Sequence, residues 1–171
     1  MKTRDIALYG LLITFGLIMS YVEAQIPAFF AVPGMKLGLA NVAVLLSLYL
    51  IGHKAALLIN LLRVVIAGLL FGSGISLAFS TAGAICSWCG MVLLKKGGFR
   101  TVTVSIVGGL LHNVGQILVA MIVLSTSQVV WYFVALWLSG MASGAVIGVL
   151  GGLLVKRLGP VIRRFEQGAS I

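Results

Sequence analysis

Acidic residues are nearly missing from this chain of 171 residues, because Asp5, Glu23 and Glu166 are the only three. Charged residues make up 9% of the chain and hydrophobic residues 61%, whereas an average soluble domain has about 25% and about 45–50%. A soluble core of this length cannot bury so much apolar surface. The composition therefore excludes an ordinary soluble domain, a disordered chain and a disulfide-stapled secreted module, and it predicts a protein solvated largely by lipid.

The shortage of acids also limits the chemistry that the chain can perform. A prenyl diphosphate synthase needs Asp-rich clusters to hold magnesium on diphosphate, and Asp5 is the only aspartate here. The chain has no Gly-Lys-Ser/Thr phosphate loop, and its apolar segments lack the carboxylate of a Ser–His–Asp triad. Cys86 and Cys89 have metal-ligand spacing but no further acidic or thiol ligand. We expect a protein that is not an enzyme and has no catalytic residues, metal or cofactor.

Long uncharged apolar runs dominate what remains, and they predict an all-α integral membrane protein. Six such runs give six transmembrane helices at about 6–22, 37–51, 55–71, 75–94, 101–124 and 129–155. The connections between them are short, so successive helices should be antiparallel neighbours. We expect residues 1–171 to form a single six-helix bundle without a linker or a second domain.

Basic residues predict how this bundle lies in the membrane. Ten of the twelve fall on one side if six spans are right; they are Lys2, Arg4, Lys54, Lys95, Lys96, Arg100, Lys156, Arg157, Arg163 and Arg164. Lysine and arginine collect on the cytoplasmic side, so we expect a multi-pass protein of the cell membrane with both termini in the cytoplasm. The net charge of +9 is then explained by contact with the lipid bilayer, without nucleic acid as a partner.

Lys36 and Arg63 are the two basic residues outside this ring. Lys36 lies at the predicted start of the second helix, where free N–H groups and the helix dipole also favour a phosphate or carboxylate. The alternative is that Lys36 reaches the lipid headgroups or pairs with Glu23.

Arg63 is deeper, near the middle of the third predicted helix, and the fifth contains His112, Asn113 and Gln116 at a similar depth. A charge inside a membrane is costly and usually has a partner or a function. Because the three acids lie near membrane edges, we expect no carboxylate beside Arg63, which favours a bound anion or polar substrate. The alternative is an internal hydrogen-bond network that only fixes helix packing.

Two further segments have features beyond plain apolarity. The outer connection at 23–34 is the longest, and its Phe29, Phe30, Pro33 and Gly34 predict a lid that dips into the interface, or else an aromatic anchor. Glycines recur every four residues along the sixth helix, at Gly140, Gly144, Gly148 and Gly152. Such a stripe predicts close backbone packing against another helix.

Several of these segments together resemble a known family. Residues 33–41 read PGMKLGLAN and resemble the signature P-G-x-K-L-G-L-A-N. Further matches are Leu62–Val64, Gly83, Ser87 and the run His112–Gln116, so that the resemblance covers nearly the whole chain. The family is the bacterial Gx transporter family, often labelled heptaprenyl diphosphate synthase component I. It is similar to the substrate-binding S subunits of energy-coupling factor (ECF) transporters.

This resemblance implies a six-helix S-subunit-like bundle that binds its ligand in the outer half, under the loop at 23–34. The expected substrate-binding residues are Lys36, Asn41, Arg63, His112, Asn113 and Gln116. The ligand would be a small micronutrient or an isoprenoid- or quinone-like precursor, with the ECF transmembrane and ATPase subunits as partners. Two alternatives stay open: a non-catalytic scaffold or regulatory subunit for polyprenyl diphosphate or quinone synthesis, and an autonomous secondary transporter with His112 in proton coupling.

Overall fold

The computed structural model describes residues 3–25, 38–72, 74–125, 131 and 133–167, and these residues form helices and no β-strand. Six helices follow one another along the chain: α1 (Thr3–Gln25), α2 (Asn41–Leu50), α3 (His53–Phe71), α4 (Gly74–Lys96), α5 (Thr101–Leu124) and α6 (Phe133–Gln167). The all-α class predicted from the apolar runs is thus confirmed.

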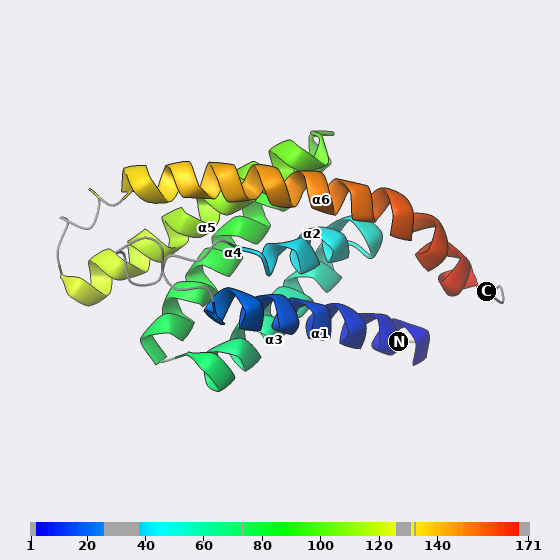
Figure 1. Cartoon of the computed structure of the whole chain (residues 1–171), viewed down its shortest axis with the longest axis horizontal. Coiled ribbons are helices and arrows are strands. Elements are labelled where there is room, and N and C mark those ends of the chain that lie inside the picture. Colours follow the sequence, from blue (N-terminus) through cyan, green and yellow to red (C-terminus); the bar gives the residue numbers. More distant parts are fainter. Residues whose placement is uncertain (1–2, 26–37, 73, 126–130, 132, 168–171) are drawn as a thin grey trace.

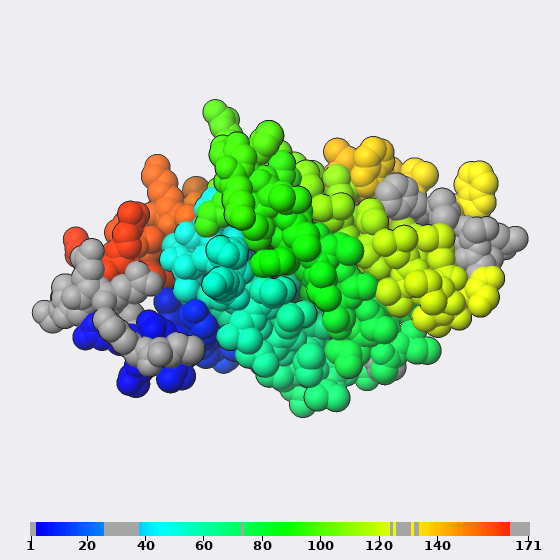
Figure 2. Space-filling model, turned by 180° about the vertical axis from the view of Figure 1, so that it is seen from behind, coloured from blue at the N-terminus to red at the C-terminus, as the bar shows by residue number. Residues whose placement is uncertain are grey.

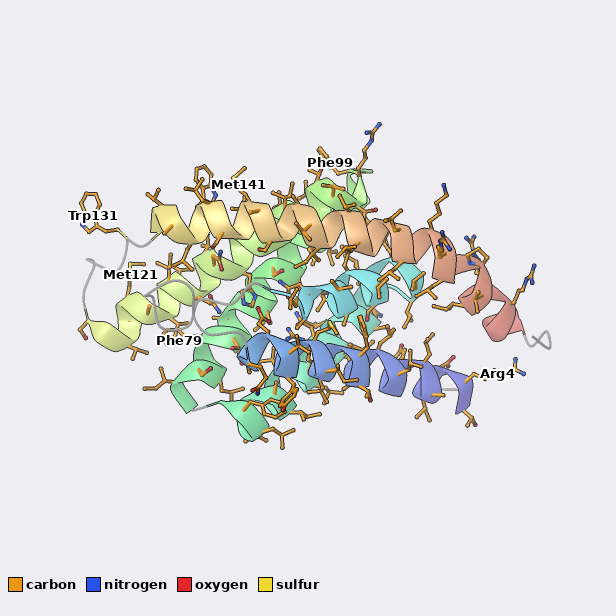
Figure 3. All side chains as sticks on the ribbon, viewed as in Figure 1. Arg4, Phe79, Phe99, Met121, Trp131 and Met141 are labelled. Atoms are coloured by element: carbon orange, nitrogen blue, oxygen red, sulfur yellow. The ribbon has the colours of Figure 1, made fainter. Side chains whose placement is uncertain are left out.

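The helices run back and forth along the long axis of the molecule (Figure 1). The beginning of α1 and the end of α6 lie at the same end of this axis, and the α3–α4 connection lies toward the other (Figure 1). In Figure 3, Arg4 and Trp131 mark these two opposite ends. Successive helices are therefore antiparallel, as the short connections predict.

The core of the bundle surrounds α2. Seven of its ten residues are buried, and α1, α3 and α6 all pack against it. Leu45 and Leu48 have almost no exposed surface and join Ile59 of α3 and Val104 of α5 in one apolar cluster. Ser47 is the single polar residue among the seven buried residues of α2. Its hydroxyl donates to the carbonyl of Ala43 at 2.6 Å, so that no polar atom of its side chain is left unsatisfied.

Five of the six helices are long and apolar enough to cross a membrane, and α2 is the exception. A helix of ten residues is about 15 Å long, whereas the hydrocarbon core of a bilayer is about 30 Å thick. The predicted second span at 37–51 therefore becomes, within the described residues, a short helix enclosed by the others. The length and apolar composition of the remaining five helices indicate a multi-pass membrane protein.

Large apolar side chains cover the outside of the bundle. Leu69 and Ile122 are 75% and 77% exposed, and the opposite face of the molecule shows α3 and α4 side by side at its surface (Figure 2). A soluble monomer rarely exposes so much contiguous apolar surface. These outward faces fit a lipid environment.

The last helix is longer than the sequence predicts. It reaches Gln167 instead of ending near residue 155, and it contains Pro160 in its interior. Proline removes a backbone donor and bends a helix, and α6 curves toward its C-terminal end (Figure 1). The extension carries basic residues, Lys156, Arg157, Arg163 and Arg164, which is why an apolar-run criterion stops before it.

Glycines of α6 lie directly against α5. A Cβ atom built on Gly144 or Gly148 would come within 2.7 Å of the Cα of Ile106 and within 2.6 Å of the Cα of Val102, respectively. One built on Gly140 would meet the amide nitrogen of Asn113 at 2.6 Å. At Gly152 the nearest atom is 3.7 Å away, an ordinary contact distance. The stripe is thus tight at its first three glycines and makes an ordinary contact at the fourth.

Candidate functional site

Arg63 is buried in α3, with only 7% of its surface exposed, and its guanidinium is directed toward α1. Nη1 donates to the hydroxyl of Ser20 at 3.1 Å and Nη2 to the side-chain carbonyl of Asn60 at 2.8 Å. Nε has no hydrogen-bond partner within the part of the chain that the structure describes. Gly16 makes room for the arginine, because a Cβ there would lie 2.7 Å from Arg63 Cδ.

A carboxylate acts on this arginine, contrary to the expectation from the sequence. Glu23 is 9% exposed, and its charge interacts with that of Arg63. The same carboxylate accepts a hydrogen bond from the backbone N–H of Gly38. The expectation failed because Glu23 looks like a membrane-edge residue in the sequence, whereas Ser20 and Glu23 lie one turn apart on α1 and both face α3.

A small cavity adjoins this cluster at the end of α1. Its volume is about 120 Å³, and it is lined by Ser20, Glu23, Ala24, Ala67, Gly68, Phe71, Gly72 and Ser76. The rings of Tyr21 and Phe71 meet beside it, with centroids 5.4 Å apart. The cavity thus offers a carboxylate and hydroxyls on one side and apolar surface on the other.

Asn60 is a member of this cluster that the sequence analysis did not single out. Its carbonyl accepts from Arg63, and its amide donates to the backbone carbonyl of Ala84 on α4 at 3.2 Å. Arg63 is therefore tied to α1 directly and to α4 through Asn60. The sequence could have identified Asn60 as a partner of Arg63, because residues three apart share a helix face.

The polar residues of α5 form contacts with other helices. His112 and Gln116 lie one turn apart on a buried face of α5. The distance between their Nε2 atoms is 3.2 Å. The histidine lies against α4, since a Cβ on Gly83 would be 2.9 Å from the imidazole Cε1. The two side chains are close because residues four apart share a helix face.

Asn113 faces a different neighbour. Its amide donates to the backbone carbonyl of Leu136 on α6 at 2.6 Å. Arg63 is thus held by α1 and α3, the His112–Gln116 pair lies against α4, and Asn113 binds α6. In the described residues, these predicted substrate-binding side chains therefore make contacts with several different helices.

Asn41 begins α2 and is half-buried. Its backbone N–H donates to the carbonyl of Gly38 at 2.8 Å, which closes a turn in which Gly38 has a φ of +79°. The other predicted ligand-binding residue of this segment, Lys36, lies outside the described residues. So do the predicted lid residues Phe29, Phe30, Pro33 and Gly34.

The chemistry available at the Arg63 cluster is recognition by hydrogen bonds and charge. It combines a guanidinium with a buried unpaired Nε, a carboxylate and a hydroxyl next to a small cavity. Across the described ranges, no three histidine, cysteine or acidic side chains come together as metal ligands. Such a set of donors and acceptors can bind a polar group of a small ligand.

Comparison with known proteins gives one finding. No curated protein and no solved structure matches the chain. A protein-family model does match it, over residues 12–154, which include all of α2 to α5, the described cluster around Arg63 and the glycines of α6. The chain belongs to the family described as heptaprenyl diphosphate synthase component I.

Proposed function

We propose that this chain is a non-catalytic substrate-binding subunit of an ECF-type importer in the bacterial cell membrane, with both termini in the cytoplasm. The observation that carries this proposal is the buried Arg63–Glu23–Ser20 cluster beside a cavity at one end of the bundle. A charged residue at this depth costs about 2.5 kcal/mol or more, and such residues usually serve a substrate path or a binding site.

The cavity indicates the size and character of what is bound. About 120 Å³ is below the roughly 300–1,000 Å³ of pockets that enclose a drug-sized ligand. It therefore receives a small solute or the polar end of a larger one. Glu23 and the serine hydroxyls bind that end, and Phe71 covers apolar atoms. A micronutrient or an isoprenoid- or quinone-like precursor has this combination.

Energy for transport comes from elsewhere in this proposal. The sequence contains no nucleotide-binding loop, so import depends on a transmembrane partner and an ATPase. His112, Asn113 and Gln116 then help to hold α4, α5 and α6 in the arrangement that the ligand needs.

The test is to identify small molecules that co-purify with the protein and to compare variants. Mass spectrometry of the extract from wild-type protein should show a compound that is reduced with Arg63→Gln, because Arg63 does not line the cavity itself but holds Ser20, which does. Arg157→Gln removes an exposed arginine on α6 and serves as the matched control. Equal amounts of every compound per folded protein with both variants would remove Arg63 from the site.

A second function is favoured by the family to which the chain belongs. Its description names a component of heptaprenyl diphosphate synthase, which suggests a membrane subunit that holds a soluble synthase near its lipid product. Affinity purification of the tagged chain distinguishes the two functions. Recovery of a soluble prenyl synthase supports the scaffold, and recovery of ATPase and transmembrane subunits supports the importer.

A further inference from the structure

A second cavity lies at the other end of α4 from the Arg63 cluster. Its volume is about 220 Å³, and it is lined by Leu48, Gly52, His53, Val92, Lys95 and Lys96. We call it the lysine pocket. Ser76, which lines the first cavity, is nineteen residues from Lys95 on the same helix, or about 28 Å along its axis. The two cavities are therefore separate.

The lysine pocket carries positive charge that no lining carboxylate balances. Two lysines and a histidine contribute to its wall, and no acidic residue does. Within the described residues, neither Asp5 nor Glu23 lines the pocket, and Glu23 is engaged with Gly38 and Arg63 at the opposite end of the bundle. An anion from outside the chain is the natural counterion for such a wall.

Lys95 is held in place before any ligand arrives. Its ammonium donates to the carbonyl of Leu48, in the last turn of α2, and lies 5.0 Å from the ring centroid of Tyr49. Leu48 takes one of the three N–H donors of the ammonium, so that others are available to a ligand. Two turns earlier on α4, the indole of Trp88 donates to the carbonyl of His53 at 2.9 Å. Both side chains fix the α2–α3 connection against α4, and this gives the pocket a rigid wall.

We propose that the lysine pocket binds a phosphate group, carried by an anionic membrane lipid or by a soluble phosphate compound. Lysine ammonium groups bind phosphate as point charges. Leu48 and Val92 add apolar surface beside the charges, which suits the glycerol and first acyl carbons of a lipid. In the orientation proposed above, this end of α4 faces the cytoplasm, where the membrane surface is rich in anionic lipid.

Trp88 provides the readout, because it adjoins the pocket. The protein contains three tryptophans, and replacing Trp131 and Trp137 by phenylalanine leaves Trp88 as the only reporter. Purified protein in detergent is titrated with dihexanoyl phosphatidylglycerol, with dihexanoyl phosphatidylcholine and with inorganic phosphate. We expect a saturable change in Trp88 fluorescence with phosphatidylglycerol and a weaker one with phosphatidylcholine, whose choline is repelled by the lysines.

Charge-removing variants test the assignment. Lys95→Gln together with Lys96→Gln should weaken the phosphatidylglycerol affinity about tenfold or more. Lys96→Gln alone should weaken it in the same direction, and it changes only an exposed side chain, so that folding is preserved. Lys156→Gln, an exposed lysine of α6 that does not line the pocket, is the matched control and should leave the affinity unchanged.

The outcomes separate the two sources of phosphate. Phosphatidylglycerol binding much tighter than inorganic phosphate identifies a lipid, and equal affinity for the two identifies a soluble phosphate compound. The absence of a saturable response to both phosphatidylglycerol and inorganic phosphate, or an affinity unchanged by both the double and the single lysine variant, would overturn the phosphate site. None of these results depends on the ligand of the Arg63 cluster.

Discussion

At the scale of single residues, the fold buries two opposite charges, Arg63 and Glu23, which an apolar environment disfavours. Arg63 and Glu23 come from α3 and α1, and both are almost fully buried. Taking two charges out of water costs several kcal/mol each, and their attraction repays this only when further hydrogen bonds complete the site. Ser20, Asn60 and the N–H of Gly38 supply those bonds. The pair consequently joins α1, α3 and the start of α2.

Removing both charges should therefore cost less stability than the sum of the two single removals. Arg63→Gln removes a cation that acts on the buried Glu23 carboxylate, and Glu23→Gln removes an anion that acts on the guanidinium. Breaking a buried charge pair from one side costs about 3–5 kcal/mol, so each single variant should lower the melting temperature in detergent. The double variant should lose less than the sum of the two, because the interaction between the two charges is lost only once. Strictly additive losses would show that the two side chains are not coupled.

The residues of this cluster were only partly predictable. Arg63 stands out in the sequence as a lone charge inside an apolar run, and the same reasoning found His112, Asn113 and Gln116. The role of Glu23 was not predictable, because its distance from Arg63 depends on how α1 packs on α3. Asn60 was missed although it lies three residues before Arg63, because its other partner, the carbonyl of Ala84, is on a different helix.

At the scale of elements, α5 and α6 approach each other closely enough for their backbones to touch. Backbone atoms of Val102 and Ile106 occupy the space that a side chain on Gly148 or Gly144 would need. Close approach of backbones lets helices associate in a membrane through dispersion and polar contacts. This contact fixes Asn113 near Leu136, so that the hydrogen bond between α5 and α6 depends on the glycines.

Replacing a glycine by alanine should therefore destabilise the protein at a tightly packed position and not at a position with ordinary contacts. Gly148→Ala forces a Cβ against the backbone at Val102 and should lower the free energy of unfolding by about 1–3 kcal/mol, as overpacking does. Gly152→Ala meets only ordinary contacts and gains helix propensity, so the stability should be unchanged or slightly higher. Thermal unfolding of the two variants in the same detergent measures the difference. Equal melting temperatures would mean that α6 is displaced from α5 in the membrane.

Element boundaries followed from sequence where the apolar runs ended in glycine or charge. The predicted start of the helix at 101 and the end of the helix at 71 agree with α5 and α3. The predicted lengths of α2 and α6 were wrong in opposite directions, because α2 is shorter than predicted and α6 extends further than predicted. The apolar run at 37–51 includes the turn at Gly38, which shortens the helix, and the basic stretch after residue 155 continues helical past Pro160.

At the scale of the whole molecule, the orientation in the membrane is a prediction that labelling can check. After Cys86 and Cys89 are replaced by alanine, single cysteines are placed at Lys96 and at Gly74, where a side chain meets no other atom within 4 Å. A membrane-impermeant maleimide added to intact cells should label the cysteine at position 74 only. Labelling at position 96 from outside would reverse the orientation, and with it the assignment of the lysine pocket to the cytoplasmic side.

The shortness of α2 has a consequence for how the protein is made. A ten-residue helix is about half as long as the bilayer core, so it is a poor substrate for independent insertion by the translocon. Only two residues, Ile51 and Gly52, separate it from α3, and its apolar surface is covered by neighbouring helices instead of lipid. We expect α2 to enter the membrane as a hairpin with α3 and to reach its final depth only after α6 has left the ribosome.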